Sequence, residues 1–200
     1  MTDVASTTDS PGETRIDARG DMRSRLVDAA LAVLQRDGAA GLTVRAITTE
    51  AGCSTTGVYT YFGGKHGLVD AIFNQGFDSF DEAVGPGLRS GDLVEGGRAY
   101  RRWAFEHPTQ YMVMFGSAVP DYEPSDDARV RSLESFQRLA DGVARAGIAG
   151  RRGETVEQTA YHFFATVHGY VMLEMASMSS AVDVADDELY DGALRRLVES

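Results

Sequence analysis

Seven polar residues between positions 43 and 65 have the chemistry to bind nucleic acid, and none of the seven is an acid. Threonine and tyrosine hydroxyls can donate hydrogen bonds to phosphate oxygens and base edges, and threonine methyls can contact the methyl group of thymine. An arginine can reach phosphate or guanine. The set is Thr43, Arg45, Thr55, Thr56, Tyr59, Thr60 and Lys65. A solvated helical face is the alternative explanation for such a set.

Two short helices joined by a tight turn, between Leu42 and Leu68, are expected to position these residues. Gly52 stands where the first helix should end in left-handed geometry, and Ser54 can cap the second by accepting a bond from a backbone N–H. Apolar residues at helical spacing predict a face that packs on a preceding helix and turns the seven polar residues outward. This face consists of Val44, Ile47, Ala51, Cys53, Val58 and Phe62.

This segment resembles the helix-turn-helix of TetR-type transcriptional regulators. The matching residues are Leu42, Thr43, Val44 and Ile47, then Ala51, Gly52, Cys53 and Ser54, then Tyr59, Tyr61, Phe62, Lys65 and Leu68. The resemblance implies a three-helix head that binds double-stranded operator DNA, with Ser54 beside the seven polar residues as a DNA contact. It also implies that Lys65 binds a backbone phosphate.

Glycines mark the main departures from the family pattern. Gly57 lowers helix stability by about 1 kcal/mol relative to alanine, which indicates either close approach of another backbone or tolerated looseness. Gly63, Gly64 and Gly67 replace a better-capped start of the next helix, so the capping there stays open. Cys53 replaces a branched apolar residue and is expected to fill the turn as a small hydrophobe.

The net charge of −11 is unevenly distributed along the chain. Residues 1–66 hold seven cations against eight acids, whereas residues 67–200 hold twelve cations against twenty-two acids. Local potential rather than total charge decides the affinity of a surface for phosphate. The first part of the chain is therefore the one suited to DNA.

The whole chain reads as all-α. We expect a disordered arm at 1–20, a DNA-binding domain at 21–66 and a helical regulatory and dimerisation domain at 67–200. Arg19, Arg23 and Arg25 near the start of the first helix could touch the minor groove or flanking phosphates, with solvated charges as the alternative. Helices are predicted at 22–37, 65–84, 93–106, 109–115, 126–146, 155–177 and 186–198, besides the two of the motif. Gly38 should end the first of these, and Gly85, Pro86 and Gly87 should end the second.

The C-terminal part resembles, over two local stretches, the regulatory domain of the WHG type found in some TetR-like proteins. This resemblance implies a pocket for a small, largely apolar effector, although core packing also explains aromatic and methionine residues. The candidate pocket residues are Trp103, Tyr111, Met114, Phe115, Phe164 and His168. A solid helical bundle, in a DNA-binding regulator controlled by a protein partner or by abundance, is the alternative.

Apolar stripes on the last two helices predict a four-helix interface between two copies of the chain. The predicted interface residues are Phe163, Val167, Val171, Leu194 and Leu197. A homodimer would place two recognition helices about one DNA turn apart, which predicts a pseudo-palindromic operator. By the habit of the family, the protein would be a repressor that its ligand releases from DNA.

Other functional classes lack their motifs. No HExxH, CxxC, nucleotide-binding loop or GxSxG sequence occurs, so we expect no catalytic residues, metal or cofactor. No apolar run approaches membrane-spanning length, and residues 1–20 lack the apolar core of a signal peptide. A single cysteine excludes an internal disulfide framework. We therefore expect a cytoplasmic protein.

Overall fold

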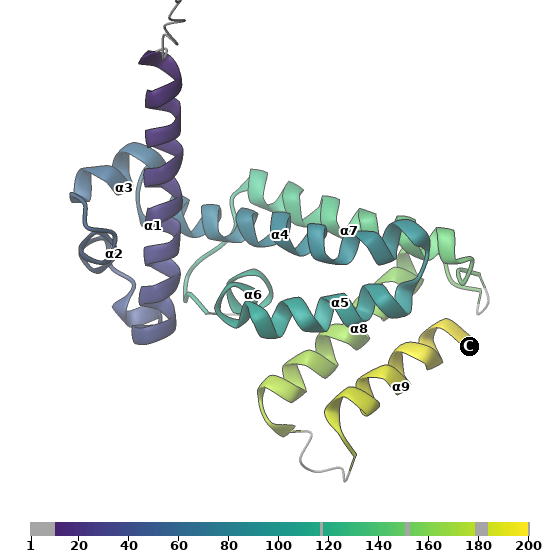
Figure 1. The fold of residues 1–200 in the computed structure, drawn as a ribbon. Helices are drawn as coiled ribbons and strands as arrows, with labels where there is room; N and C mark the ends of the chain where they lie inside the picture. Colours follow the sequence, from purple (N-terminus) through teal and green to yellow (C-terminus); the bar gives the residue numbers. More distant parts are fainter. Residues whose placement is uncertain (1–10, 117, 151–152, 179–183, 200) are drawn as a thin grey trace, which may run out of the picture. The chain divides into compact units, whose positions relative to one another are not determined.

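The computed structural model describes residues 11–116, 118–150, 153–178 and 184–199, with the backbone alone for 11–19. These ranges contain helices and no strands, so the all-α prediction is confirmed (Figure 1). The helices are α1 (Pro11–Gly41), α2 (Val44–Ala51), α3 (Thr55–Phe62), α4 (Lys65–Ser90), α5 (Leu93–Glu106), α6 (Pro108–Phe115), α7 (Asp126–Ala146), α8 (Val156–Met175) and α9 (Asp186–Glu199).

The chain forms two compact units. Unit 1 comprises the chain up to Ile72 together with Ser117–Tyr122, and unit 2 comprises Phe73–Gly116 and Glu123–Ser200. Helix α4 therefore begins in unit 1 and ends in unit 2. The predicted boundary at residue 66 precedes the observed one by less than two helical turns.

The core of unit 1 forms where α1 meets the two short helices. The apolar face of α1 is buried between Leu26 and Leu34, and Ile47 and Ala51 of α2 and Val58 of α3 are buried with it. Gly52 and Gly63, both in left-handed geometry, end α2 and α3. The buried residues of α1 are Leu26, Val27, Ala29, Ala30, Val33 and Leu34. The predicted packing face of the motif is confirmed for its central residues.

Helix α1 is longer than predicted at both ends. It begins at Pro11, so the second half of the expected arm is helical, whereas residues 1–10 lie outside the described residues. Gly38 has a φ of 66° and interrupts the helical geometry, but a further turn follows to Gly41. The glycine thus produces a kink instead of the predicted end.

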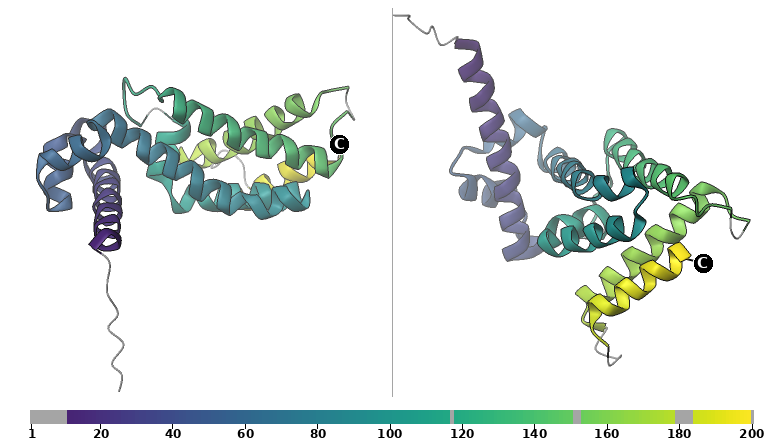
Figure 2. Two further views of the ribbon diagram at one scale, coloured as in Figure 1. Left: turned by 90° about the horizontal axis from the view of Figure 1, so that it is seen from above. Right: turned by 45° about the vertical axis from the view of Figure 1, so that its right-hand side comes forward.

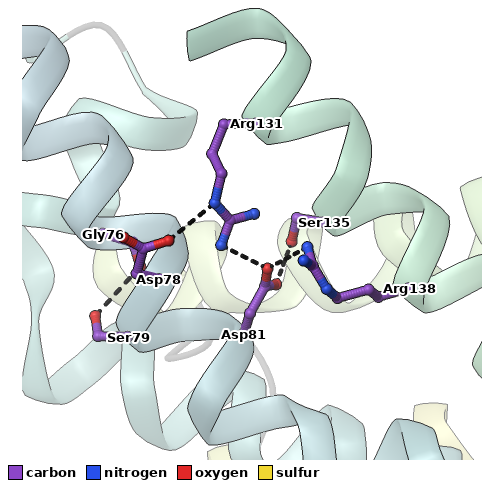
Figure 3. Close-up of polar contacts among 7 residues, drawn as sticks. All are labelled: Gly76, Asp78, Ser79, Asp81, Arg131, Ser135 and Arg138. Carbon is purple, nitrogen blue, oxygen red and sulfur yellow. Dashed lines mark hydrogen bonds and ion pairs between the residues drawn. The ribbon is translucent and has the colours of Figure 1, made fainter. Parts of the chain in front are cut away.

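In unit 2, α8 packs against α7, α5 and α9, and polar side chains join α4 to α7. Asp81 of α4 binds Arg131 and Arg138 of α7, each at 2.8 Å, and accepts a hydrogen bond from Ser135 (Figure 3). Helix α9 lies alongside α8 in the views of Figures 1 and 2. The Tyr190 hydroxyl of α9 donates to the Gly97 carbonyl of α5 at 2.7 Å.

The predicted break at Gly85, Pro86 and Gly87 was wrong, because α4 continues to Ser90. Pro86 is exposed, so the backbone hydrogen bond that it removes is lost on the solvent side of the helix. Gly87 is buried, and a Cβ atom there would lie 2.5 Å from the Gly96 nitrogen of α5. The glycine is therefore needed for close packing of α4 on α5, and the helix ends before Gly91, whose φ is 78°.

Candidate functional site

The eight predicted DNA contacts all lie on the surface of unit 1. They come from the start of α2, from α3 and the residue before it, and from the first residue of α4. Tyr59 is 60% exposed, although it is a large aromatic residue on a short helix. The exposed residues are Thr43, Arg45, Ser54, Thr55, Thr56, Tyr59, Thr60 and Lys65.

The capping role predicted for one of these hydroxyls, that of Ser54, is not observed, whereas another hydroxyl caps a helix without having been predicted to do so. Thr43, predicted only as a DNA contact, caps α2, because its Oγ1 accepts a hydrogen bond from the Ala46 N–H at 3.1 Å. Ser54 has the backbone conformation of a cap residue, but its side chain makes no capping bond to α3. The predicted Ser54 cap bond was therefore wrong. The backbone N–H at the start of α3 that Ser54 would have bound is therefore left for another acceptor.

The starts of α2, α3 and α4 carry no acid in their first turns. Arg45 stands in the first turn of α2, and Lys65 is the first residue of α4. The N-terminus of a helix carries partial positive charge and favours an anion, so a cation there is unfavourable by itself. Glu50, an acid of α2, lies in the last turn and pairs with Arg36 at 2.8 Å. The arrangement is suited to an external anion such as phosphate.

The arginines of α1 are used within unit 1. Arg25 donates to the Ala51 carbonyl at the end of α2 at 2.6 Å, and Arg23 donates to the Tyr61 carbonyl of α3 at 3.0 Å. The Arg23 guanidinium also lies over the Phe62 ring, 4.6 Å from its centroid. Arg23 and Arg25 thus hold the ends of α2 and α3. Both side chains are exposed, and their suggested contact with DNA stays a prediction. The side chain of Arg19 lies outside the described residues.

Two glycines near the predicted DNA contacts, Gly57 of α3 and Gly67 of α4, have different roles. A Cβ atom at Gly57 would meet Cys53 Sγ and Leu26 Cδ1 at 3.7 Å, an ordinary contact, so no neighbour within unit 1 requires glycine there. A Cβ atom at Gly67 would collide with the Phe62 carbonyl. Gly67 is therefore required where the first turn of α4 passes the end of α3, a role that the sequence did not suggest.

In unit 2, a buried chain of hydrogen bonds joins α5, α6 and α8. The Tyr111 hydroxyl lies 2.8 Å from His168 Nδ1 and 2.9 Å from the Tyr100 hydroxyl. Burial lowers the pKa of His168 and raises the pKa of Tyr111 to about 12, so all three groups are neutral near pH 7. A neutral imidazole nitrogen and a tyrosine hydroxyl can each take either part in such a bond, so the chain of hydrogen bonds can run in either direction with the matching His168 tautomer. Tyr100 was missed in the sequence, although it precedes Trp103 by one helical turn.

The six predicted pocket residues, two of which belong to these hydrogen bonds, differ in their exposure to solvent. Phe115, Phe164 and His168 have ring centroids 5.6–5.8 Å apart and keep part of their surface exposed. By contrast, Tyr111 has no accessible surface, and Trp103 and Met114 are 3% and 8% exposed. In this conformation the three buried residues are enclosed by their neighbours, and their assignment to a ligand pocket stays a prediction.

The predicted dimer residues also require correction. Phe163, Val167 and Val171 of α8 and Leu194 of α9 are buried within the single chain, and only Leu197 keeps partial exposure. Their side chains pack inside unit 2 and cannot contact a second copy. The large exposed apolar residues of α8 are Tyr161 and Leu173, at 61% and 53% exposure.

The described residues contain no group of three or more His, Cys, Asp or Glu side chains that could hold a metal ion. Among the helices in that part of the chain, none is long and apolar enough to cross a membrane.

Each of the two units contains a stretch that matches a known protein family. Residues 26–72 match the family described as bacterial regulatory proteins, tetR family, and residues 93–197 match the tetracyclin repressor-like C-terminal domain. The second match does not specify the WHG type, which stays a prediction.

Relatives extend this likeness over most of the chain. The HTH-type transcriptional regulator Rv1816 of Mycobacterium tuberculosis is 30% identical over 147 residues, 67% of this chain and 62% of that protein. This chain thus matches less than two thirds of that relative's length. SCO4313, described as a regulatory protein, has a TM-score of 0.80 at 25% identity over 92% of this chain and 98% of its own. AibR, solved with isovaleryl coenzyme A and operator DNA, has a TM-score of 0.62 at 19% identity over 88% and 98%, a likeness of fold alone.

Proposed function

The chain belongs to the TetR family of bacterial transcriptional regulators, and from that premise we propose that it represses transcription by binding a pseudo-palindromic operator as a homodimer. The surface formed by the starts of α2, α3 and α4 supports this proposal most. It combines exposed hydroxyls, two cations and helix N-termini without acids. Lys65 and Tyr59 bind phosphate, while Thr55, Thr56 and Thr60 help to read bases.

Selection of DNA from a random pool by the full chain tests the proposal. We expect enrichment of two related half-sites whose centres lie about one helical turn apart. Replacing Lys65 by alanine should weaken binding to all sequences alike and lower the salt slope by about one unit. Replacing Thr55, Thr56 and Thr60 by valine should instead change the selected sequence. A pool without enrichment would contradict the proposal.

The dimer forms, in this proposal, through the exposed side of α8 instead of the buried stripe first predicted. Tyr161, Ala165, Gly169 and Leu173 follow one another at four-residue spacing, which places them on one face of the helix. The small side chains between Tyr161 and Leu173 allow a second helix to approach closely. This face and the neighbouring exposed side of α9 supply the four-helix contact of two copies.

Light scattering on single-residue variants tests this interface. Leu173→Glu should convert a dimer into a monomer, because it places a charge on the apolar face. Leu133→Glu is the matched control, since Leu133 is 66% exposed on α7 and should leave the dimer intact. A dimeric Leu173→Glu protein would exclude this face.

The signal that releases the operator is, we propose, a small and largely apolar molecule that binds at Phe115, Phe164 and His168. The enclosed Tyr111 favours the alternative of a regulator without a small-molecule ligand, because a ligand at Tyr111 would first have to open the core. DNA selection with and without a panel of apolar compounds separates the two. Coupling is reciprocal, so a true effector must bind more weakly in the presence of operator DNA.

A further inference from the structure

Tyr122, in the segment between α6 and α7, contacts the first two turns of α4. Its hydroxyl donates to Asp70 Oδ1 at 2.6 Å, and its ring centroid lies 5.4 Å from that of His66. His66 Nδ1 in turn lies 3.7 Å from Asp70 Oδ2. Because His66 directly follows Lys65, these contacts hold the part of α4 that carries a proposed DNA contact.

The hydrogen bond from Tyr122 belongs to the strong class. Its acceptor is a carboxylate, and hydrogen bonds to charged groups are shorter and stronger than those between neutral groups. The Asp70 side chain is only 15% exposed, so water competes little for it. Burial and the bond to Asp70 both raise the pKa of Tyr122, so the hydroxyl keeps the proton that it donates.

The residues before α4 restrain its first turn only weakly. Gly63 and Gly64 precede Lys65, with φ angles of 71° and 139°, and glycine has the greatest conformational freedom of all residues. The first N–H groups of a helix also have no partner within the helix. Contacts with other segments therefore decide where Lys65 is placed.

The backbone that presents Tyr122 to α4 is itself well defined. Asp121 has a φ of 60°, a left-handed conformation that is uncommon for residues other than glycine. Such a conformation persists where the surrounding structure determines it. Tyr122 therefore approaches α4 from a fixed position.

Tyr122 contacts a side of α4 that differs from the side of Lys65. Successive residues of a helix are turned by about 100°, so His66 and Asp70 lie about 100–140° around the helix from Lys65. Lys65 is exposed. It therefore stays open to an external phosphate while Tyr122 holds the helix from another side.

We propose that Tyr122 is a positioning residue for DNA binding, because its bond to Asp70 fixes the first turns of α4 and thereby places Lys65 at a backbone phosphate. This role rests on the proposed function of Lys65. It adds a residue from outside the stretch 26–72 that matches the family of the head. Without the bond, the start of α4 adopts other arrangements, and Lys65 reaches the phosphate in a smaller fraction of molecules.

Tyr122→Phe removes the hydroxyl and keeps the ring. Fluorescence anisotropy measures its binding to a labelled duplex that carries the half-sites selected from the random pool. We expect the affinity to fall about fivefold, because Kd rises as the binding-competent fraction falls. The salt slope should fall by up to about one unit, toward that of Lys65→Ala, which a residue with a merely structural role would not cause.

A double variant separates positioning from general damage to the fold. If Tyr122 acts through Lys65, Tyr122→Phe should have no further effect in a Lys65→Ala background, whereas independent losses would multiply in Kd. Tyr190→Phe is the matched control, because it removes a buried hydroxyl that donates to the Gly97 carbonyl at 2.7 Å in unit 2. It should lower the thermal unfolding temperature and leave DNA affinity unchanged.

Hydrogen exchange tests the same proposal without DNA. The Val69 and Asp70 amides bond one helical turn back, to the carbonyls of Lys65 and His66. They should exchange at least about tenfold faster in Tyr122→Phe, since a hydrogen bond to a charged group is worth that factor or more.

Three outcomes would overturn the proposal. They are unchanged exchange at the start of α4 in Tyr122→Phe, wild-type DNA affinity in the same variant, and multiplied losses in the double variant. A wild-type chain that does not bind the selected duplex would instead contradict the proposed function, and the positioning role would fall with it.

Discussion

Three helices of unit 1, α2, α3 and α4, begin in the opposite way from most helices of unit 2. In unit 1, the first turns of α2, α3 and α4 contain no acid, and two of them contain a cation. In unit 2, four of the five helices that begin there have acids in the first turn, and α6, which follows His107, is the exception. These acids are Glu95 of α5, Asp126 and Asp127 of α7, Glu157 of α8, and Asp186, Asp187 and Glu188 of α9.

The difference shows what each unit is built to meet. An acid in the first turn stabilises an exposed helix by about 0.3–1 kcal/mol, and the helices of unit 2 have this stabilisation from their own side chains. Helices α2, α3 and α4 of the head lack it. Their positive ends are compensated only when an anion arrives from outside, which is what a DNA backbone provides. The head therefore gives up some stability for affinity.

The test with the largest expected effect places acids in the first turns of the head helices, as in unit 2. Replacing Arg45 and Lys65 by glutamate should weaken operator binding about 100-fold at 0.1 M salt, because two phosphate contacts become repulsive. Fluorescence anisotropy with labelled operator measures the loss, and thermal unfolding should show a head that is no less stable. Asp126→Lys on α7 is the reverse change in unit 2 and should leave operator affinity unchanged. Full affinity in the glutamate variant would remove the basis of the comparison.

Within unit 2, charged side chains pair with one another. Removing one member of such a pair should therefore lower the stability of the fold and leave DNA binding unchanged. Asp81 is 10% exposed and neutralises Arg131, which is 16% exposed. Asp81→Ala should lower the free energy of unfolding by about 2–3 kcal/mol, because it leaves a mostly buried guanidinium without that partner. Urea denaturation measures this change. Asp78→Ala, which removes a partner that is 72% exposed, should cost well under about 1 kcal/mol.

The two cap positions of the head should respond differently to alanine. Thr43→Ala removes a capping hydrogen bond and should lower the free energy of unfolding by about 1 kcal/mol. Ser54→Ala removes no such bond, so urea denaturation should detect little change, whereas operator affinity should fall. Equal stability losses in both variants would mean that Ser54 also caps its helix in solution.

Gly57 provides the smallest test, and it decides between two explanations of this residue. Because the site has room for a Cβ atom, Gly57→Ala should raise the free energy of unfolding by about 0.5–1 kcal/mol. If operator affinity stays the same, the glycine is tolerated looseness. A more stable protein that binds operator poorly would instead indicate close approach of the DNA backbone to α3.

The local features of the head could be predicted from sequence because each depends on neighbours in the chain. Gly52 ends a helix through its own φ angle, and the spacing of Ile47, Ala51 and Val58 defines a buried face. The exposure of the predicted DNA contacts follows from the same spacing. The roles of Arg23 and Arg25 do not, because the carbonyls that they bind lie 26 to 38 residues away.

The sequence was less informative where contacts between helices far apart in the chain determine where a helix ends or which of its sides is buried. Gly85, Pro86 and Gly87 look like a helix end, but Gly87 is required by the backbone of Gly96 on another helix. The wide apolar stripe of α8 has two sides, and periodicity alone does not tell which side faces the core. The predicted dimer residues came from the inner side for that reason.

The composition of unit 1 from two stretches of chain has a consequence for protein engineering. Ser117–Tyr122 belongs to unit 1 although it follows α6 of unit 2, and the Tyr122 hydroxyl donates to Asp70 of α4 at 2.6 Å. The head is thus not a removable cassette that ends at residue 72. A chimaera that transplants it onto another family member must carry residues 117–122 as a second graft, and a fragment cut after Ile72 would lack part of its own packing.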